Sequence, residues 1–484
     1  MMERIALFLI GLYSLGSARW GSNFSEYHLS LPSLDFPVFI SEILLAVCLL
    51  LWAVQYERQK MVWTKGHKLF VIYWAFVVVK ALGEYGAWGP LAFRNAALFY
   101  YPAFAFLGYC FYKREYFSPW SIYAALALCI VLSIRLFDTG YFVYTLFALA
   151  VVLLFHVRPV VLRAVLAVIL IGSANYAGMF VGSRTNLMGT LAALLFLIVV
   201  FVRYFLKGGS RVKTAVGAAV VLAVLAGVVH FADRNGVRSL LKVRNLYQIY
   251  LDDNAYIAQL KQHYQPRPLT VALYNDNAAL KIQRTPAAPA PQQQMVSPPA
   301  SVPVAAPAPQ RQTSSASTEP TGPVAAQQIY RSLADAQGNA VFRLLIWRDM
   351  FEELKEHPLR GVGFGKPQRS PSLEIMNWGF GDWNRDGWIT PHNVYLHMIY
   401  RLGIVGALVI VVLFGVVFYL TKNFILLRSK DGILLVSILI YWLMACNSLV
   451  ILELPHYAIP FWTLMGLTLA YCNEQRKNKA LRNT

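Results

Sequence analysis

Long apolar runs, separated by short polar segments, make up most of the chain. A helix needs roughly 17–25 apolar residues to cross the hydrocarbon core of a bilayer. About twelve runs fit this requirement and predict an all-α polytopic membrane protein, with spans near 4–18, 37–55, 67–83, 97–112, 119–137, 141–157, 159–180, 186–206, 213–232, 394–421, 432–452 and 456–472. The first run, with Arg4 before it and small residues near Ser17, would also suit a signal peptide. Its removal would leave the facing of every later span unchanged.

The composition supports the membrane assignment. Of 484 residues, 57% are hydrophobic and 14% are charged, whereas soluble globular chains carry about 25% charged residues. One core could not bury this excess of apolar surface, so a soluble enzyme of two or three domains is excluded. The cysteines lie in or beside apolar runs without metal-ligand spacing, which argues against a disulfide framework (Cys48, Cys110, Cys129, Cys446 and Cys472).

The positions of Lys and Arg in the short loops predict the orientation, because cytoplasmic loops are enriched in these residues. With residue 1 in the cytoplasm, the inner loops, the tail and Arg4 hold about 20 Lys and Arg. The short outer loops hold about three, namely Arg19, Arg94 and Arg184. Much of the net charge of +19 therefore follows from topology, and it does not indicate a nucleic-acid partner.

The long polar stretch 233–393 then faces the periplasm, or the cell exterior in the absence of an outer membrane. We divide the chain into a membrane domain 1–232 with about nine spans, an outer loop domain 233–393, three C-terminal spans within 394–472 and a basic cytoplasmic tail 473–484. Within the loop domain, 285–328 contains 32 Pro, Ala, Gln or Ser among 44 residues. We expect this insert to be disordered, because it has too little apolar surface to offset its ordering entropy.

The end of the outer loop domain has a distinct pattern. A helix is expected over 340–356, ending at His357-Pro358, and a glycine-rich turn follows at 361–365. The turn lacks the preceding strand and the Lys-Ser/Thr pair of a phosphate-binding loop. We therefore expect a sharp turn packed near the membrane and not a nucleotide site.

Three outer arginines are candidates for anion binding: Arg94 and Arg184 at the outer ends of spans, and Arg343 in the expected helix. An ionisable group at a membrane edge is costly to desolvate and is a functional candidate by default. A single arginine in this position is about equally often a residue without a function, whose side chain merely reaches the lipid headgroups. Several converging arginines repel unless an anion bridges them, and a lipid pyrophosphate suits their forked donors.

A histidine at the start of the tenth span is the candidate base. The unperturbed pKa of imidazole, about 6.5, lets neutral His392 accept a proton near physiological pH. A lone interfacial histidine is more often a structural, hydrogen-bonded residue. His357, at a helix end, and His397, one turn deeper, are weaker candidates for the same role.

The setting of His392 contains a motif. His392-Asn393 is followed after nine residues by Gly403-Ile404-Val405-Gly406, whose glycines allow a neighbouring helix to approach closely. This pattern resembles the signature of bacterial O-antigen ligases, Wzy-type repeat-unit polymerases and related protein O-oligosaccharyltransferases. Further pieces occur in the expected order: Ser183-Arg184 opening a span, Arg343 to Trp347 starting an outer helix, then His357-Pro358-Leu359 and 361–365. The specific part of the resemblance covers about 182–206 and 340–406.

The resemblance implies a metal-independent, inverting glycosyltransferase of the GT-C type, without a cofactor, in the bacterial inner membrane with its site on the periplasmic side. The donor is a glycan on undecaprenyl pyrophosphate, and the acceptor is lipid A–core or another glycan. By analogy, Arg184 and Arg343 hold the pyrophosphate, with Arg94 as a further candidate, and His392 draws the proton from the acceptor hydroxyl. Ser183, Asn393, Gly403 and Gly406 would have supporting roles.

Asp382-Trp383-Asn384-Arg385-Asp386-Gly387 repeats the first half of a calcium loop. Asn393 stands where the bidentate Glu of such a loop is expected, so a plain Asx-rich turn is favoured over a calcium site formed by Asp382, Asn384 and Asp386.

Other functions remain open. A polymerase or a protein O-oligosaccharyltransferase would share the donor and the base with a ligase and differ in the acceptor. A transporter or flippase is disfavoured, because the charged candidates lie at the membrane boundary and not near the midplane, and no internal repeat is evident.

Overall fold

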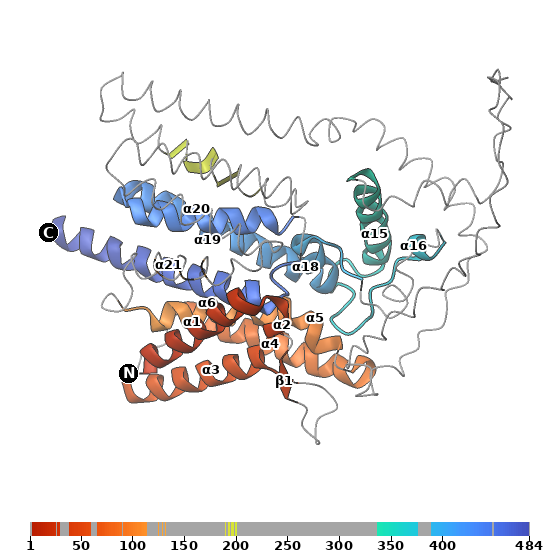
Figure 1. The fold of residues 1–484 in the computed structure, drawn as a ribbon, viewed down its shortest axis with the longest axis horizontal. Coiled ribbons are helices and arrows are strands. Elements are labelled where there is room, and N and C mark those ends of the chain that lie inside the picture. Colours follow the sequence, from red (N-terminus) through yellow and green to blue (C-terminus); the bar gives the residue numbers. More distant parts are fainter. Residues whose placement is uncertain are drawn as a thin grey trace, which may run out of the picture.

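The computed structural model describes residues 2–25, 27–29, 38–59, 65–89, 91–113, 336–375, 389–447 and 450–483, with single positions near 124–131 and 189–200. Its helices are α1 (Met2–Trp20), α2 (Ser22–Ser25), α3 (Ile40–Gln59), α4 (Lys65–Trp88), α5 (Leu91–Tyr100), α6 (Ala103–Phe111), α15 (Ala336–Glu356), α16 (Pro371–Ile375), α18 (Val394–Leu402), α19 (Ile404–Leu427), α20 (Lys430–Ala445) and α21 (Pro455–Asn483) (Figure 1). The strands found in these ranges, β1 (His28–Leu29) and β2 (Val38–Phe39), form one short antiparallel pair.

Three helices of the described ranges are long and apolar enough to cross a bilayer, within Ile40–Glu57, Lys65–Trp88 and Ile404–Leu427. Large apolar side chains remain exposed along them, including Leu69 of α4 and Phe418 of α19. Such exposure would be unfavourable in water and is expected for a surface that contacts lipid. The described part of the chain is therefore a helical membrane protein.

Five predicted spans correspond to helices: 4–18 to α1, 37–55 to α3, 67–83 to α4, 432–452 to α20 and 456–472 to α21. The five predicted between 119 and 232 lie outside the described residues, apart from single positions, as do the insert 285–328 and the front of the outer loop domain.

Two spans predicted as single helices are each divided into two helices in the structure. The run 97–112 is α5 followed by α6, and the helix begins earlier, at Leu91. The break falls at Tyr101-Pro102, because Pro102 has no N–H to bond the preceding turn. The run 394–421 is α18 followed by α19, and Gly403 between them has a φ of 55°, which ends a right-handed helix.

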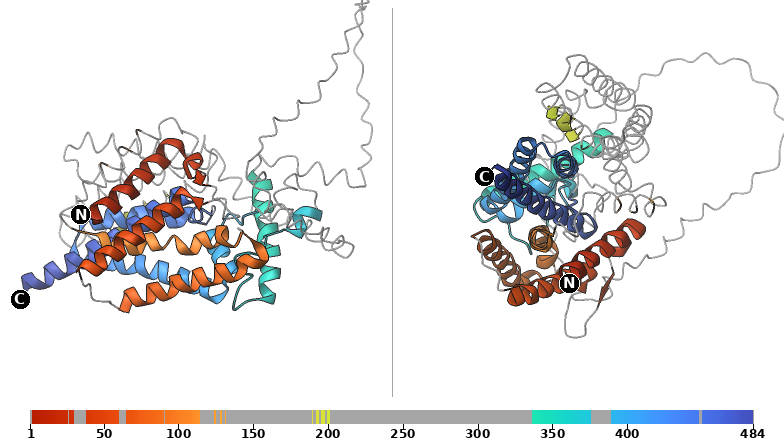
Figure 2. Two further views of the ribbon diagram at one scale, coloured as in Figure 1. Left: turned by 90° about the horizontal axis from the view of Figure 1, so that it is seen from below. Right: turned by 90° about the vertical axis from the view of Figure 1, so that its left-hand side faces the viewer.

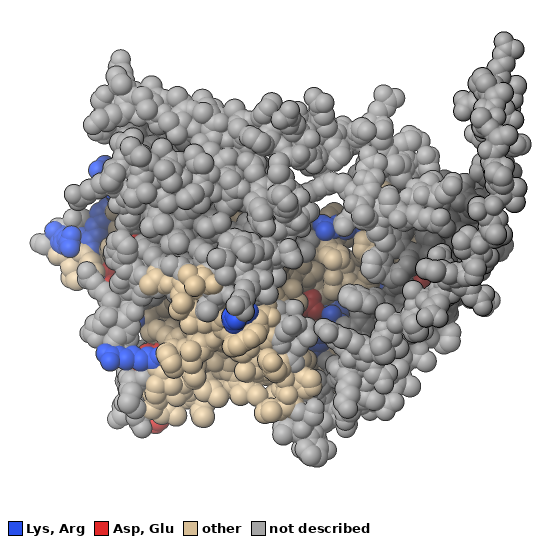
Figure 3. Space-filling view, viewed as in Figure 1, with Lys and Arg blue, Asp and Glu red and all other residues tan. Residues whose placement is uncertain are grey.

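Both chain termini lie at one end of the helical bundle, and α15 and α16 lie at the other (Figures 1 and 2). The basic end of α21 is at the end with the termini, where Lys and Arg side chains gather in Figure 3. This arrangement agrees with the predicted orientation, in which the termini and the outer loop domain are on opposite sides of the membrane.

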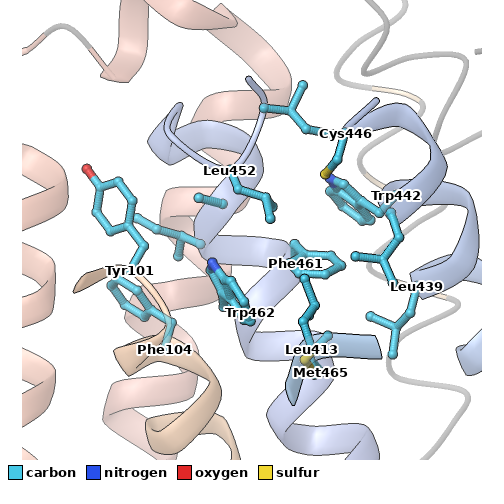
Figure 4. Close-up of a cluster of buried hydrophobic side chains, with 14 of the residues drawn as sticks. Tyr101, Phe104, Leu413, Leu439, Trp442, Cys446, Leu452, Phe461, Trp462 and Met465 are labelled. Carbon is cyan, nitrogen blue, oxygen red and sulfur yellow. The ribbon is translucent and has the colours of Figure 1, made fainter. Parts of the chain in front are cut away.

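The core forms where α6, α19, α20 and α21 pack together (Figure 4), with Phe104, Leu413, Leu439, Phe461 and Trp462 among its buried side chains. The backbones of α6 and α21 approach closely at two glycines. A Cβ on Gly466 would clash with the Ala105 carbonyl, and one on Gly108 would lie 2.6 Å from the Thr463 carbonyl oxygen. Small residues at a helix crossing permit such contact, which stabilises packing inside a membrane.

Candidate active site

Helix α15, which carries Arg343, is fixed against α18. It ends at Glu356, directly before His357-Pro358, as the sequence predicts. Its apolar face forms one buried cluster with α18 (Val341, Leu345, Ile346, Leu396 and Tyr400). On the polar side, Glu353 accepts a hydrogen bond from the Tyr400 hydroxyl and pairs with Lys366 at 2.5 Å.

The glycine-rich turn docks on the C-terminal end of α18. The backbone N–H of Val362 donates to the Tyr400 carbonyl at 2.8 Å, and the N–H of Gly363 donates to the Arg401 carbonyl at 3.1 Å. Gly361, with a φ of 70°, lies so close to Gly403 that a Cβ on Gly403 would be 2.6 Å from the Gly361 nitrogen. The residues 361–365 thus form a packed turn at the end of the bundle, as the sequence predicts.

Helices α4 and α5 hold the other side of this turn. Glu84 of α4 accepts a hydrogen bond from the Gly365 N–H at 2.6 Å and pairs with Lys80 at 2.9 Å. Asn95 of α5 donates to the Phe364 carbonyl at 2.6 Å. The segment between α15 and α18 is therefore anchored to the N-terminal part of the membrane domain.

A buried polar network centres on Arg401, whose side chain is 1% exposed. Its guanidinium donates to His397 Nε2 at 3.0 Å and to the carbonyls of Gly363 and Lys366 at 3.1 and 2.6 Å. His397 Nδ1 lies 3.3 Å from Glu453 Oε2. Because His397 Nε2 accepts from Arg401, its Nδ1 carries the proton when the ring is neutral.

His392 lies in a tight turn at the start of α18. Its φ of 50° is in the left-handed region, which non-glycine residues rarely adopt. Asn393 caps α18, because its Oδ1 accepts the Leu396 N–H at 3.0 Å. The Val394 N–H donates to the Cys446 carbonyl at 2.9 Å, which ties the turn to the end of α20.

The structure brings Arg343 and His392 together. The ring of Phe342, next to Arg343 in the chain, lies with its centroid 6.4 Å from that of His392. Burial and the neighbouring Arg343 guanidinium lower the pKa of His392 to about 4. Both the low-dielectric surroundings and the adjacent positive charge disfavour the imidazolium, so His392 is neutral at physiological pH.

Arg94 lies in the first turn of α5, and its Nε is 3.8 Å from Glu453 Oε1. Glu453 thereby connects Arg94 with His397 and Arg401, and its own side chain is 8% exposed. A carboxylate this close offsets part of the positive charge of Arg94.

Five other residues predicted for the active site or for a calcium loop lie outside the described residues. They are Ser183, Arg184, Asp382, Asn384 and Asp386.

The expected close approach to a neighbouring helix is found at Gly406 of α19, whose backbone packs on that of Met398 in α18. Gly403, at the bend between these two helices, packs instead on the glycine-rich turn, on the backbone of Leu359 and Gly361.

Sequence reasoning missed three residues of this region: Trp347, Arg401 and Glu453. Trp347 Nε1 donates a hydrogen bond to the Pro391 carbonyl at 2.7 Å. Arg401 and Glu453 each interrupt an apolar stretch, which is a recognisable signal. The contact of Arg401 with His397, four residues earlier, follows from helical spacing, whereas that of Glu453 with His397 depends on the tertiary fold.

A comparison with protein families decides the assignment of the chain. The family model described as O-antigen ligase matches residues 168–411, which is just over half of the 484 residues. The chain belongs to the O-antigen ligase family. The matched segment contains Arg343, His392 and α18, whereas Arg94 and Glu453 lie outside it. Among the curated proteins, none matches the chain.

Membership makes this chain a membrane enzyme of the O-antigen ligase and polymerase type, which acts on lipid-linked glycans and a glycan acceptor. The resemblance first evident in the His-Asn motif is thereby confirmed at the level of the family.

Proposed function

We propose that this chain is an integral inner-membrane glycosyltransferase that joins a glycan from undecaprenyl pyrophosphate to an acceptor hydroxyl on the periplasmic side. Its form would be that of an O-antigen ligase, with lipid A–core as the acceptor. The observation that carries this proposal is the proximity of His392 to Arg343, whose charge helps to keep the imidazole neutral, inside the family match and at the bundle end opposite both termini.

The reaction proposed is an inverting substitution at the anomeric carbon. His392 accepts the proton of the acceptor hydroxyl as its oxygen attacks. A bond forms between this oxygen and the anomeric carbon, and the bond between that carbon and the phosphate oxygen breaks. The pair of electrons leaves with the undecaprenyl diphosphate, so no metal ion or nucleotide is needed for the balance of the step.

Arg343 and Arg184 would hold the diphosphate and stabilise its developing charge. Arg343 is well suited, because helix α15, which packs against α18, carries its guanidinium near His392. Arg94 would be a weaker third contact, since Glu453 lies 3.8 Å from its guanidinium.

The identity of the acceptor distinguishes a ligase from a polymerase and from a protein O-oligosaccharyltransferase. Purified protein should be incubated with undecaprenyl-pyrophosphate repeat units, with and without lipid A–core. A single class of adduct that needs lipid A–core supports the ligase. A ladder of repeat units without lipid A–core would instead identify a polymerase, and transfer only to an added protein would identify a protein O-oligosaccharyltransferase.

The same assay tests the class of protein. Movement of the lipid-linked glycan across a vesicle without formation of any glycosidic bond would overturn the proposal in favour of a flippase. Activity should persist in a strong chelator, and its loss would instead favour a metal at Asp382, Asn384 and Asp386.

A further inference from the structure

Helix α15 contributes more than Arg343 to the surroundings of His392. Trp347 is four residues after Arg343, and side chains at this spacing lie on the same face of a helix, one turn apart. The Trp347 indole N–H donates to the carbonyl of Pro391, the residue directly before His392, at 2.7 Å. One helix face thus presents a cation beside His392 and a hydrogen bond to the turn that carries it.

The backbone at His392 has to be held in place. A non-glycine residue in the left-handed region, as His392 is, has an unfavourable backbone conformation that persists only when its surroundings fix it. After His392, the Asn393 cap and the Val394–Cys446 backbone bond supply this constraint. Before His392, the Pro391 carbonyl is the one hydrogen-bonding group of that residue, because proline has no N–H. Trp347 occupies it.

The packing of Trp347 favours a role through the backbone of the turn and not through contact with substrate. Trp347 is partly buried and packs against the cluster that joins α15 to α18. Phe342, one turn earlier, contacts the His392 ring itself. The ring and the backbone of the turn are therefore both set by α15, so any displacement of this helix would move His392 and Arg343 together.

We propose that Trp347 is a positioning residue, which holds the imidazole of His392 in register with Arg343 by binding the Pro391 carbonyl. This inference rests on the proposed function, because it assigns Trp347 to the base of that reaction. Loss of the hydrogen bond would let the turn relax and would misplace His392. Arg343 would stay on α15 and continue to bind the donor.

Trp347→Phe keeps an aromatic ring and deletes the donor. We expect kcat to fall at least tenfold while the KM for undecaprenyl-pyrophosphate glycan stays within twofold, because a misplacement of about 1 Å can cost roughly 100-fold in rate. The matched control is Trp462→Phe in the core of α21. The Trp462 indole N–H has no hydrogen-bond partner in the part of the chain that the structure describes, so this change should leave kcat near that of the wild type.

If Trp347→Phe does not fold, benzothienylalanine at position 347 provides the second variant. It has the shape of tryptophan and lacks the N–H, and the same fall in kcat is expected. Unchanged kcat, a rise in donor KM alone, or an equal fall in the Trp462→Phe control would each overturn the positioning role. His392→Ala separates this failure from that of the proposed function. An inactive His392→Ala beside a fully active Trp347→Phe rejects the role of Trp347, whereas an active His392→Ala rejects the base itself.

Discussion

His392 combines an unusual backbone with an unusual ionisation state, and both arise from its neighbours. The turn is held from α15 and from α20, while burial and the Arg343 guanidinium keep the imidazole neutral. A low pKa makes His392 a weak base in the empty site. A diphosphate bound to Arg343 would offset the positive charge, so binding of the donor is expected to raise the pKa of His392 toward its ordinary value.

The pH dependence of transfer should show this coupling. In the proposed reaction the neutral form of His392 is the active one, and in the unliganded protein it persists down to a pKa of about 4. We therefore predict that kcat/KM loses activity on the acid side near pH 4, and that kcat, which reports the donor-bound enzyme, loses activity at a higher pH. Samples held at each pH and assayed at pH 7 control for denaturation. An acid limb of kcat/KM at or above pH 6.5 would contradict this account of His392.

Arg343 should act on the donor. Replacing Arg343 with Ala removes a charge-assisted contact to the diphosphate, and we expect donor use to weaken by about tenfold or more even at saturating acceptor. Arg184→Ala should behave in the same way. Arg360→Ala is a suitable control, because Arg360 lies beyond the end of α15 and contacts His357, and it should leave kinetics unchanged. An effect confined to the acceptor concentration would argue against the diphosphate contact.

The residues with chemical roles were partly predictable from sequence. His392 and Asn393 stand in a motif with fixed spacing, Arg343 opens a separate piece of the resemblance, and the structure brings them near one another. Trp347 belongs to the same piece as Arg343, but its bond to the Pro391 carbonyl depends on how α15 lies across α18. That geometry is a property of the tertiary packing and has no counterpart in local spacing.

The helices of the described ranges follow from apolar length, and their breaks follow from single residues. Hydropathy alone predicts α1, α3, α4, α20 and α21 well, because each apolar run corresponds to one helix. It fails at Pro102 and Gly403, where the apolar run continues through a break in the helix. A window average cannot detect a change of backbone direction that leaves hydropathy unchanged.

The break at Gly403 should be indispensable for the stability of the site. Gly403→Ala would place a methyl 2.6 Å from the Gly361 nitrogen at a backbone conformation disfavoured for any other residue. We predict a loss of about 1–3 kcal/mol in the free energy of unfolding, and reduced transfer. Gly415→Ala is the matched control within α19, since a methyl there meets nothing within 4 Å and should be neutral or slightly stabilising. Equal unfolding midpoints in detergent for the two variants would refute the role of Gly403.

The molecule as a whole is polarised along the bundle. The termini and the basic end of α21 occupy one end (Figure 2), and the other end carries α15, the glycine-rich turn and buried or partly buried ion pairs such as Lys80–Glu84 and Arg94–Glu453. Loop charges in the sequence predict this polarity, because they are counted over the whole chain. The place of Glu453 in the network with His397 and Arg401 was not predictable, since Glu453 lies more than fifty residues after these two residues of α18.

The insert 285–328 should be dispensable for transfer, because its composition offers little apolar surface for packing. We predict that deletion of 285–328 leaves the transfer rate within about twofold of the wild type. Deletion of 361–365, the turn docked on α18, should abolish transfer and serves as the contrasting control. The comparison requires equal amounts of folded protein in the membrane, measured by fluorescence-detected size exclusion. A deletion of 285–328 that removes activity without affecting folding would show that the insert has a role in the reaction.

The role of His392 as the base is tested most directly by the single-turnover rate of His392→Ala in proteoliposomes supplied with undecaprenyl-pyrophosphate glycan and acceptor. We predict a fall of about 10²–10⁴-fold, the usual contribution of a general base, with donor binding and the unfolding midpoint close to those of the wild type. Transfer by His392→Ala at the wild-type rate would show that His392 is not the base.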